Sequence, residues 1–109
     1  MREKPDVLQG TLALLVLKTL QHGPLHGWGI TLHIQQISKD VLRVEEGSLY
    51  PALQRLELNG WIDGEWGLTT ANRRARIYKL TSKGRRQLTR ETERYAQLTL
   101  AIGRVLQAE

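Results

Sequence analysis

Cysteine is absent from this sequence of 109 residues. Its absence excludes disulfide frameworks, thiolate zinc sites and thiol nucleophiles, and it is consistent with a reducing compartment. The fold must therefore be stabilised by packing alone.

A long apolar run is also absent. The one extended apolar segment, residues 12–20, is interrupted by Lys18 and is far shorter than the roughly 20 residues that a membrane-spanning helix needs. No small-residue cleavage pattern leads into it, so we expect no secretory signal. The expected location is the cytoplasm, with no membrane partner.

Signatures of catalysis and metal binding are missing as well. The sequence has no Gly-rich phosphate loop and no Gly-x-Ser-x-Gly motif, and its acidic residues are scattered rather than paired. His22, His26 and His33 do not indicate a metal site, because Gly23-Pro24 breaks any helical spacing between the first two and no carboxylate lies at ligand spacing. We expect no enzyme activity, no metal and no cofactor.

The composition that remains is that of an ordinary folded domain, with 40% hydrophobic and 25% charged residues. Its length allows one core and at most one protruding element. The formal charge of +5 is uneven, because residues 1–67 hold six basic and eight acidic side chains and residues 68–109 hold ten basic and three acidic ones. This basic part is the footprint expected of a polyanion contact, although a solvated charged face would give the same pattern.

Apolar periodicity predicts two helices in the first 40 residues. Residues 8–21 are apolar on almost every side, which is typical of a helix in the centre of a core. Residues 27–38 place Ile30, Ile34 and Ile37 on one face of a second, amphipathic helix.

A third helix is predicted to end at Asn59-Gly60. We expect a cap at Ser48 or slightly earlier, because Pro51 is tolerated in a first turn, where backbone N–H groups have no partner within the helix. One predicted face is buried and comprises Leu49, Ala52, Leu53 and Leu56. The other face, which is poorly protected for a surface, carries Tyr50, Pro51, Gln54 and Leu58.

Two short runs rich in aromatic and branched residues, 61–66 and 75–80, predict a β-hairpin whose tip at 67–74 is basic. We expect Glu65 and Arg76 to pair across its exposed face. Alternation predicts one buried face, formed by Ile62, Trp66, Tyr78 and Leu80.

A last helix is expected from the N-cap Thr81 to about Gln107. A seam of apolar side chains at heptad spacing runs along it, as in helices that associate, but it is too short for a long zipper and fits an antiparallel or crossed dimer contact better. The seam consists of Leu88, Tyr95, Leu98, Ile102 and Val105.

Three helices followed by a hairpin is the element order of a winged helix-turn-helix, whose third helix enters the major groove of DNA. The predicted fold class is mainly α with a small β-hairpin. We expect a winged helix-turn-helix DNA-binding domain over residues 1–80 and a C-terminal dimerisation helix over residues 81–109.

Several short segments stand in an order and spacing that is specific when they are taken together. They are Gly10-Thr11-Leu12, residues 23–30 (GPLHGWGI), residues 47–53 (GSLYPAL), Arg55-Leu56-Glu57, Trp61-Ile62, Arg73-Arg74 and Tyr78-Lys79-Leu80-Thr81 with Gly84. Over nearly the whole chain they resemble PadR-family transcriptional regulators, in the compact form with one helix after the wing. The resemblance implies a repressor that binds a near-palindromic operator as a homodimer joined through the C-terminal helix.

The resemblance also implies where the third helix meets DNA. Ser48, Tyr50 and Pro51 match positions that contact DNA in PadR-like proteins, at a helix start whose N–H groups face a phosphate or a base edge. Gln54 and Arg55 can make bidentate contacts with adenine and guanine. Structural roles remain open beside these: a cap for Ser48, packing on a neighbour for Tyr50, and an ion pair with Glu57 or another carboxylate for Arg55.

The predicted wing supplies charge rather than sequence recognition. Arg73 and Arg74 at its tip, with Arg76 and Lys79 on the returning strand, are expected to reach phosphates or a minor groove. If each protomer neutralises three or four phosphates, the affinity of a dimer should depend on salt with a log-log slope of about −5 to −7.

The seam on the last helix is expected to form the dimer interface, because a lone domain of this size would leave it exposed. Two copies of Tyr95 would also suit a pocket for a small planar aromatic effector, as in some relatives, and simple packing is the other interpretation. A different class of function, a protein-interaction module or antagonist that uses the winged scaffold without DNA binding, remains the alternative hypothesis. RNA is a poorer fit, because the predicted third helix suits a wide major groove and not A-form RNA.

Overall fold

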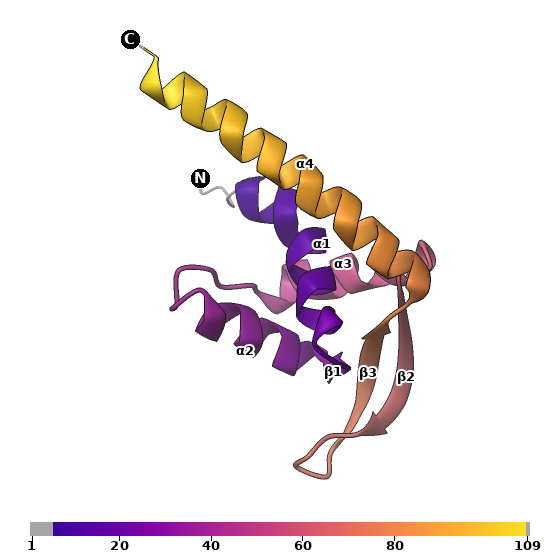
Figure 1. Ribbon diagram of the computed structural model, residues 1–109. Coiled ribbons are helices and arrows are strands. Elements are labelled where there is room, and N and C mark those ends of the chain that lie inside the picture. The colour runs from indigo at the N-terminus through magenta and orange to yellow at the C-terminus, as the bar shows by residue number, and fades with distance from the viewer. Residues whose placement is uncertain (1–5, 109) are drawn as a thin grey trace.

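The computed structural model describes residues 6–108, which form one small sheet and four helices (Figure 1). Three helices come first, the hairpin follows, and a long helix ends the chain, so the predicted fold class is confirmed. The helices are α1 (Asp6–Gln21), α2 (Gly27–Ile37), α3 (Glu46–Leu58) and α4 (Ser82–Gln107), and the strands are β1 (Leu25–His26), β2 (Ile62–Leu68) and β3 (Arg74–Leu80). None of the helices in the described part is long and apolar enough to cross a membrane.

The core surrounds α1, which contacts α2, α3, α4 and β3. Val16 and Leu17 of α1 are fully buried, as the predicted all-round apolar character requires. Ile30 and Ile34 of α2 are buried beside them, but Ile37 is 70% exposed because α2 ends there, beyond the reach of α1. The prediction for the inner face of α2 is therefore correct for its first two positions and wrong for the third.

The inner face of α3 is confirmed, since Leu49, Ala52, Leu53 and Leu56 are all buried. The start of α3 lies at the early limit of the prediction, which allowed a cap at Ser48 or slightly earlier. Glu45 is the N-cap and makes no side-chain cap hydrogen bond, so Ser48 lies inside the first turn and is not the cap. Pro51 consequently lies one turn into the helix, where its ring nitrogen has no N–H to donate to the carbonyl four residues earlier.

The sheet is antiparallel with the order β1, β3, β2. The two-residue strand β1 pairs with Tyr78 and Ile77 of β3 and ties the start of α2 to the wing. His26 then caps α2, because its Nδ1 accepts a hydrogen bond of 3.0 Å from the backbone N–H of Gly29. The strand has no counterpart in the prediction, since two residues carry no periodic signal.

The register of the hairpin corrects two predictions. Glu65 lies opposite Ile77, and Arg76 lies opposite Trp66, so Glu65 and Arg76 project from opposite faces and do not pair. Ile62, Tyr78 and Leu80 are buried as predicted, but Trp66 is 60% exposed because the hairpin has already left the core at that point.

The start of α4 is fixed to the hairpin. Thr81 is the predicted cap: its Oγ1 accepts from the Gly84 N–H at 2.9 Å and donates to the Gly60 carbonyl at 2.7 Å. Gly84 is buried so closely against the carbonyl of Trp61 that a Cβ atom there would overlap it. Leu88, one turn later, is buried in the core of its own chain, so the expectation that a lone domain exposes it is wrong. The C-terminal part of α4 projects past α1, and the molecule measures 56 × 34 × 25 Å.

Candidate nucleic-acid interface

The outward face of α3 is open to solvent along the whole helix. Tyr50, Pro51, Gln54 and Arg55 are exposed and Ser48 is half-buried, so the structure brings the five predicted residues of this helix onto one accessible element. Arg55 makes no ion pair with Glu57 or with any other carboxylate among the described residues. Its guanidinium is therefore available to a ligand.

Tyr50 combines the two roles that the sequence left open. Its ring lies close against Gly27 at the start of α2, where an added Cβ would come within 3.0 Å of the Tyr50 hydroxyl oxygen. Tyr50 as a whole nevertheless remains 47% exposed. Packing on Gly27 thus restrains the ring while about half of the residue stays open to solvent.

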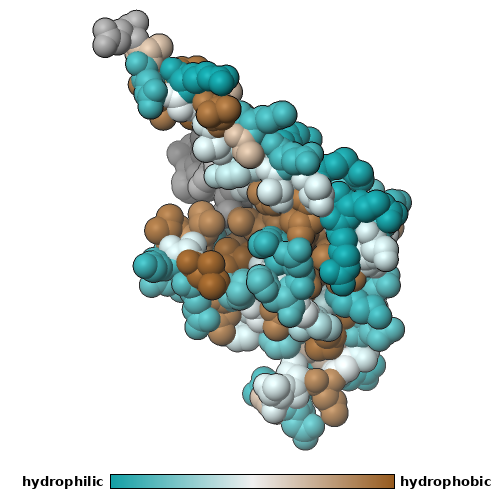
Figure 2. All heavy atoms as spheres, viewed as in Figure 1, coloured by the Kyte–Doolittle hydropathy of each residue, from teal (hydrophilic) through white to brown (hydrophobic). Residues whose placement is uncertain are grey.

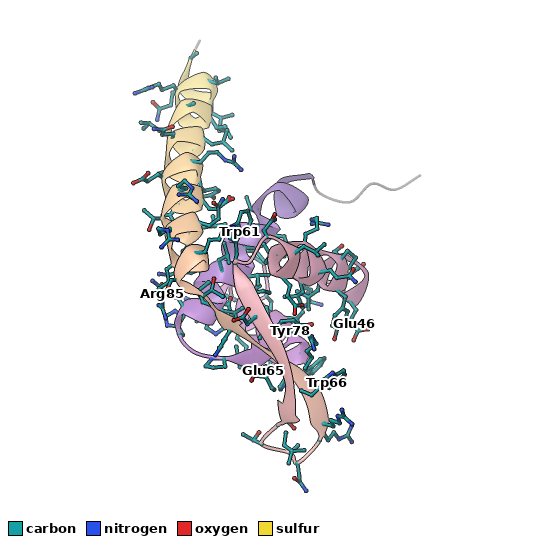
Figure 3. All side chains as sticks on the ribbon, turned by 90° about the vertical axis from the view of Figure 1, so that its right-hand side faces the viewer. Glu46, Trp61, Glu65, Trp66, Tyr78 and Arg85 are labelled. Carbon is teal, nitrogen blue, oxygen red and sulfur yellow. The ribbon has the colours of Figure 1, made fainter. Side chains whose placement is uncertain are left out.

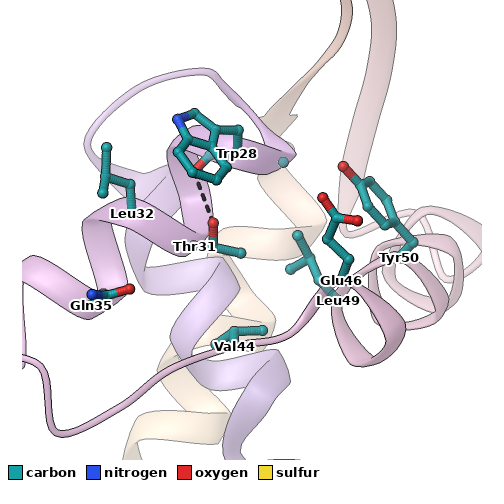
Figure 4. Close-up of a pocket in the computed structure, with 9 residues that line it drawn as sticks. Trp28, Thr31, Leu32, Gln35, Val44, Glu46, Leu49 and Tyr50 are labelled. Atoms are coloured by element: carbon teal, nitrogen blue, oxygen red, sulfur yellow. Dashed lines mark hydrogen bonds between the residues drawn. The ribbon is translucent and has the colours of Figure 1, made fainter.

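A hollow separates the start of α3 from the first turns of α2 (Figure 4). Trp28 stands over it, 65% exposed, and the Thr31 hydroxyl donates to the Trp28 carbonyl at 2.9 Å. Glu46 and Tyr50 border the opposite side. Residues of both helices line this hollow, and the start of α2 therefore belongs to the same surface as the start of α3.

We call the hairpin of residues 62–80 the wing. A second hollow lies between α3 and the wing. Its floor and sides come from both elements, and it is lined by Tyr50, Pro51, Gln54, Glu57, Arg76 and Tyr78. It continues past Trp66 toward Trp28 through an adjoining hollow of about 390 Å³. Figure 3 shows Trp66 on the side of the wing that faces α3 and Glu65 on the other side.

The wing tip carries the free cations. Arg73 and Arg74 are both exposed, and the guanidinium carbon of Arg74 lies 4.9 Å from the centre of the Trp66 ring. This distance is within the range of a cation–π interaction, which restrains Arg74 without neutralising it. Asn72 turns the tip with a positive φ of 62°, a conformation that asparagine adopts more readily than most residues.

Arg76 differs from the other wing cations, because its Nη2 donates to the Glu57 carboxylate at 2.6 Å. The guanidinium crosses β2 over Gly64, where an added Cβ would come within 2.7 Å of Nε. This hydrogen bond raises the pKa of Arg76. Arg76 therefore links the wing to α3 and is not the free phosphate ligand that the sequence predicted.

Two further features define the electrostatics near this link. Burial raises the pKa of the Tyr78 hydroxyl, and the charge of Glu57 adds to the effect. Lys79 is exposed but lies opposite Asp63 on the face of the hairpin that turns away from Tyr78 and Arg76. The structure therefore does not bring Lys79 together with the other predicted residues.

Sequence reasoning missed three members of this surface: Trp28, Trp66 and Glu57. Both tryptophans look like core residues by type, and only the geometry exposes them. Glu57 follows Arg55 by two positions, so the sequence suggested it as a partner of that residue, whereas its partner is 19 positions away.

The predicted dimer seam continues along the free part of α4. Tyr95, Leu98, Ile102 and Val105 are 46%, 53%, 48% and 74% exposed. Tyr95 and Leu98 border a shallow groove whose other side is Thr11 and Leu14 of α1. Figure 2 shows hydrophobic side chains in the angle between α1 and α4.

The histidines do not form a metal site in the described part of the chain, where no three His, Cys, Asp or Glu side chains cluster. The rings of His22 and His33 lie 5.8 Å apart and tilted by 47°, which is an aromatic contact.

Comparison with known proteins identifies the family of this chain. Residues 16–90 match the transcriptional regulator PadR-like family. The chain belongs to the PadR family. Its members regulate transcription by binding DNA and are not enzymes, so those two predictions are confirmed, and this speaks against the alternative of a module that does not bind DNA.

Individual relatives agree with this assignment. The transcriptional regulator Rv3488 of Mycobacterium tuberculosis is 31% identical over 86% of this chain and 84% of its own length. A transcriptional regulator from Clostridium thermocellum has a structure similar to this PadR-family chain, with a TM-score of 0.84 and 27% identity over 92% of this chain and 97% of its own. A PadR-like regulator from Bacillus cereus, at 23% identity and a TM-score of 0.80 over 96% of this chain and 100% of its own, shares the fold.

Proposed function

We propose that this PadR-family regulator is a cytoplasmic repressor that binds a near-palindromic operator as a homodimer. The observation that carries the proposal is the hollow between α3 and the wing: exposed residues of α3 line one side of it, and the tip of the same wing carries the exposed cations Arg73 and Arg74. A helix in the major groove with a basic hairpin on the adjacent backbone is how winged helix-turn-helix proteins bind duplex DNA.

The residues divide into two roles within this proposal. Gln54 and Arg55, in the third turn of α3, read base edges, while Ser48, Tyr50 and Pro51 nearer its start approach the backbone and the neighbouring bases. Arg73 and Arg74 neutralise phosphates. Arg76 holds the wing against α3 through Glu57.

The dimer in this proposal forms through the C-terminal helix, over residues 81–109, and joins two DNA-binding units of residues 1–80. Tyr95, Leu98, Ile102 and Val105 are the contact residues, and their exposure on a helix that projects from the core supports this assignment. Leu88 supports the contact only indirectly, because it is buried in the core of its own chain and holds the first part of α4 there.

We also propose that a small planar aromatic effector releases the repressor from DNA. Tyr95 and Leu98 border the groove between α1 and α4, and a second copy of this groove would face it across a dimer. Aromatic rings on both sides would suit a planar ligand. The prediction is a rise in melting temperature with such a compound and weaker operator binding in its presence.

The salt dependence of duplex binding tests the proposal. Replacing Arg73 and Arg74 with alanine removes four charges from a dimer, so the log-log salt slope should become shallower by about 3 to 4 and the affinity for every duplex should fall. Replacing Lys18 and Lys39, two exposed cations outside the proposed surface, is the matched control and should leave the slope unchanged. Equal effects of both pairs would contradict the proposal.

A further inference from the structure

One stripe of α3 points directly away from the core. Gly47, Pro51, Gln54 and Leu58 follow at spacings of four, three and four residues and are all exposed, Leu58 to 86%. We call these four residues the outward stripe. It spans about 16 Å along the helix axis, which corresponds to about five base pairs at 3.4 Å each.

The outward stripe contains no charged side chain. Arg55 lies to one side of it, and on the other side Glu57 holds Arg76. The free cations Arg73 and Arg74 lie on the wing tip. Guanine is read mostly by Arg or Lys through O6 and N7, and the stripe has neither residue.

The groups on the outward stripe suit an A·T base pair. The Gln54 amide is both a donor and an acceptor, the combination that pairs with N6 and N7 of adenine. Pro51 and Leu58 present only aliphatic carbon, and the aliphatic group in the major groove is the C5-methyl of thymine. A side chain at Gly47 would meet no described atom within 4 Å, so packing within the chain does not require glycine there, and its absence of a Cβ leaves room for the DNA backbone.

We infer that the base pairs contacted by the outward stripe are A·T pairs, with Gln54 on adenine and with Pro51 and Leu58 against thymine methyl groups. The inference rests on the proposed function, because it requires α3 to lie in the major groove. It makes Leu58 a specificity-determining residue, a role that its position at the end of the helix would not suggest.

The test uses duplexes in which uracil replaces thymine, since this change removes only the C5-methyl group. Binding sites are first enriched from a random duplex pool with the full-length protein, and the enriched site is then made with single thymines replaced. Affinity should fall by about fourfold at each contacted methyl, the value expected for one buried methyl group. Leu58→Ala should bind the thymine duplex more weakly and lose most of the difference between thymine and uracil at its own position.

Two controls make the result specific. Leu100→Ala changes the same residue type at an exposed position of α4 and should keep the full thymine preference. Replacing adenine by 7-deazaadenine removes N7 and should lower the affinity of the unmodified protein at the adenine that Gln54 contacts. The affinity of Gln54→Ala should not change with that replacement at this one position.

The outcomes separate the inference from the proposed function. Enrichment of a site in which uracil binds as well as thymine, or whose pairs under the stripe are G·C, would overturn the inference alone. A pool in which no duplex is enriched would overturn the proposed function, and the inference would fall with it.

Discussion

At the residue scale, the ion pair between Arg76 and Glu57 decides how much positive charge the hollow between α3 and the wing presents. Glu57→Gln removes the carboxylate and leaves the guanidinium free to contact a phosphate. We expect tighter binding to every duplex and a salt slope steeper by up to about 0.9 per protomer, or about 1.8 per dimer. Salt titrations of duplex binding measure both quantities.

Glu65→Gln is the matched control, because it makes the same charge change on the face of the wing that turns away from α3. Its salt slope should equal that of the unmodified protein. An unchanged slope in Glu57→Gln would show that Arg76 contributes no phosphate contact when it is released.

Tyr78 gives a pH dependence that belongs to one side chain. Burial raises its pKa above the ordinary tyrosine value of 10.0, so the folded protein binds the hydroxyl proton more tightly than the unfolded chain does. The resulting stabilisation is complete below about pH 10 and is lost as the pH rises through the pKa of the folded state. Urea unfolding between pH 8 and about pH 11 should therefore show a decline that Tyr78→Phe makes shallower.

The residue scale is also where sequence reasoning was least complete. Trp66 has the type and the alternation of a buried residue, but its exposure depends on how far the wing extends beyond the core. Arg76 and Glu57 are neighbours only in the folded protein, and Gly64, which makes room for their contact, carries no signal of that purpose in the sequence.

At the element scale, packing of the start of α4 against Trp61, which precedes β2, and Leu80 of β3 depends on the missing side chain of Gly84. Gly84→Ala forces a Cβ into the Trp61 carbonyl and the Leu80 side chain, so we expect a loss of about 1 to 3 kcal/mol in the free energy of unfolding. Chemical denaturation measures it.

Gly47→Ala serves as the control for this substitution. The position lies in α3 with open space around it, and alanine there should raise stability by up to about 1 kcal/mol, as helix propensity dictates. Equal stabilities of the two variants would contradict the close packing at Gly84.

The elements themselves were largely predictable because long periodic patterns determine them. The four helices and the hairpin lie within a few residues of their predicted limits, and the buried face of α3 is the predicted one. The start of α3 was predicted only as Ser48 or slightly earlier, because Ser48 is a good cap by type, whereas the chain begins the helix after Glu45 without a side-chain cap. Strand β1 could not be predicted, since its two residues are ordered by pairing with β3.

At the scale of the whole molecule, the projecting part of α4 is the basis of the proposed dimer. Leu98→Glu with Ile102→Glu places two charges on side chains that are about half exposed in the single chain, so the fold should persist. We expect a monomer by light scattering and a large loss of affinity for a two-half-site operator, because the two DNA-binding units are no longer linked. Leu100→Glu, on the opposite side of the same helix, should remain dimeric; if it also dissociates, the interface is not the one proposed.

The central claim is that α3 and the wing of a dimer bind one duplex site, and selection of bound fragments from the organism's own sheared DNA tests it most directly. At about 150 mM salt, contacts that depend on charge alone are already weakened, so sequence recognition dominates what is recovered. The account predicts a few fragments that share an inverted repeat with half-sites spaced by about one helical turn or a multiple of it. Recovery of nothing above background, or of fragments that share only single, unpaired half-sites, would contradict it.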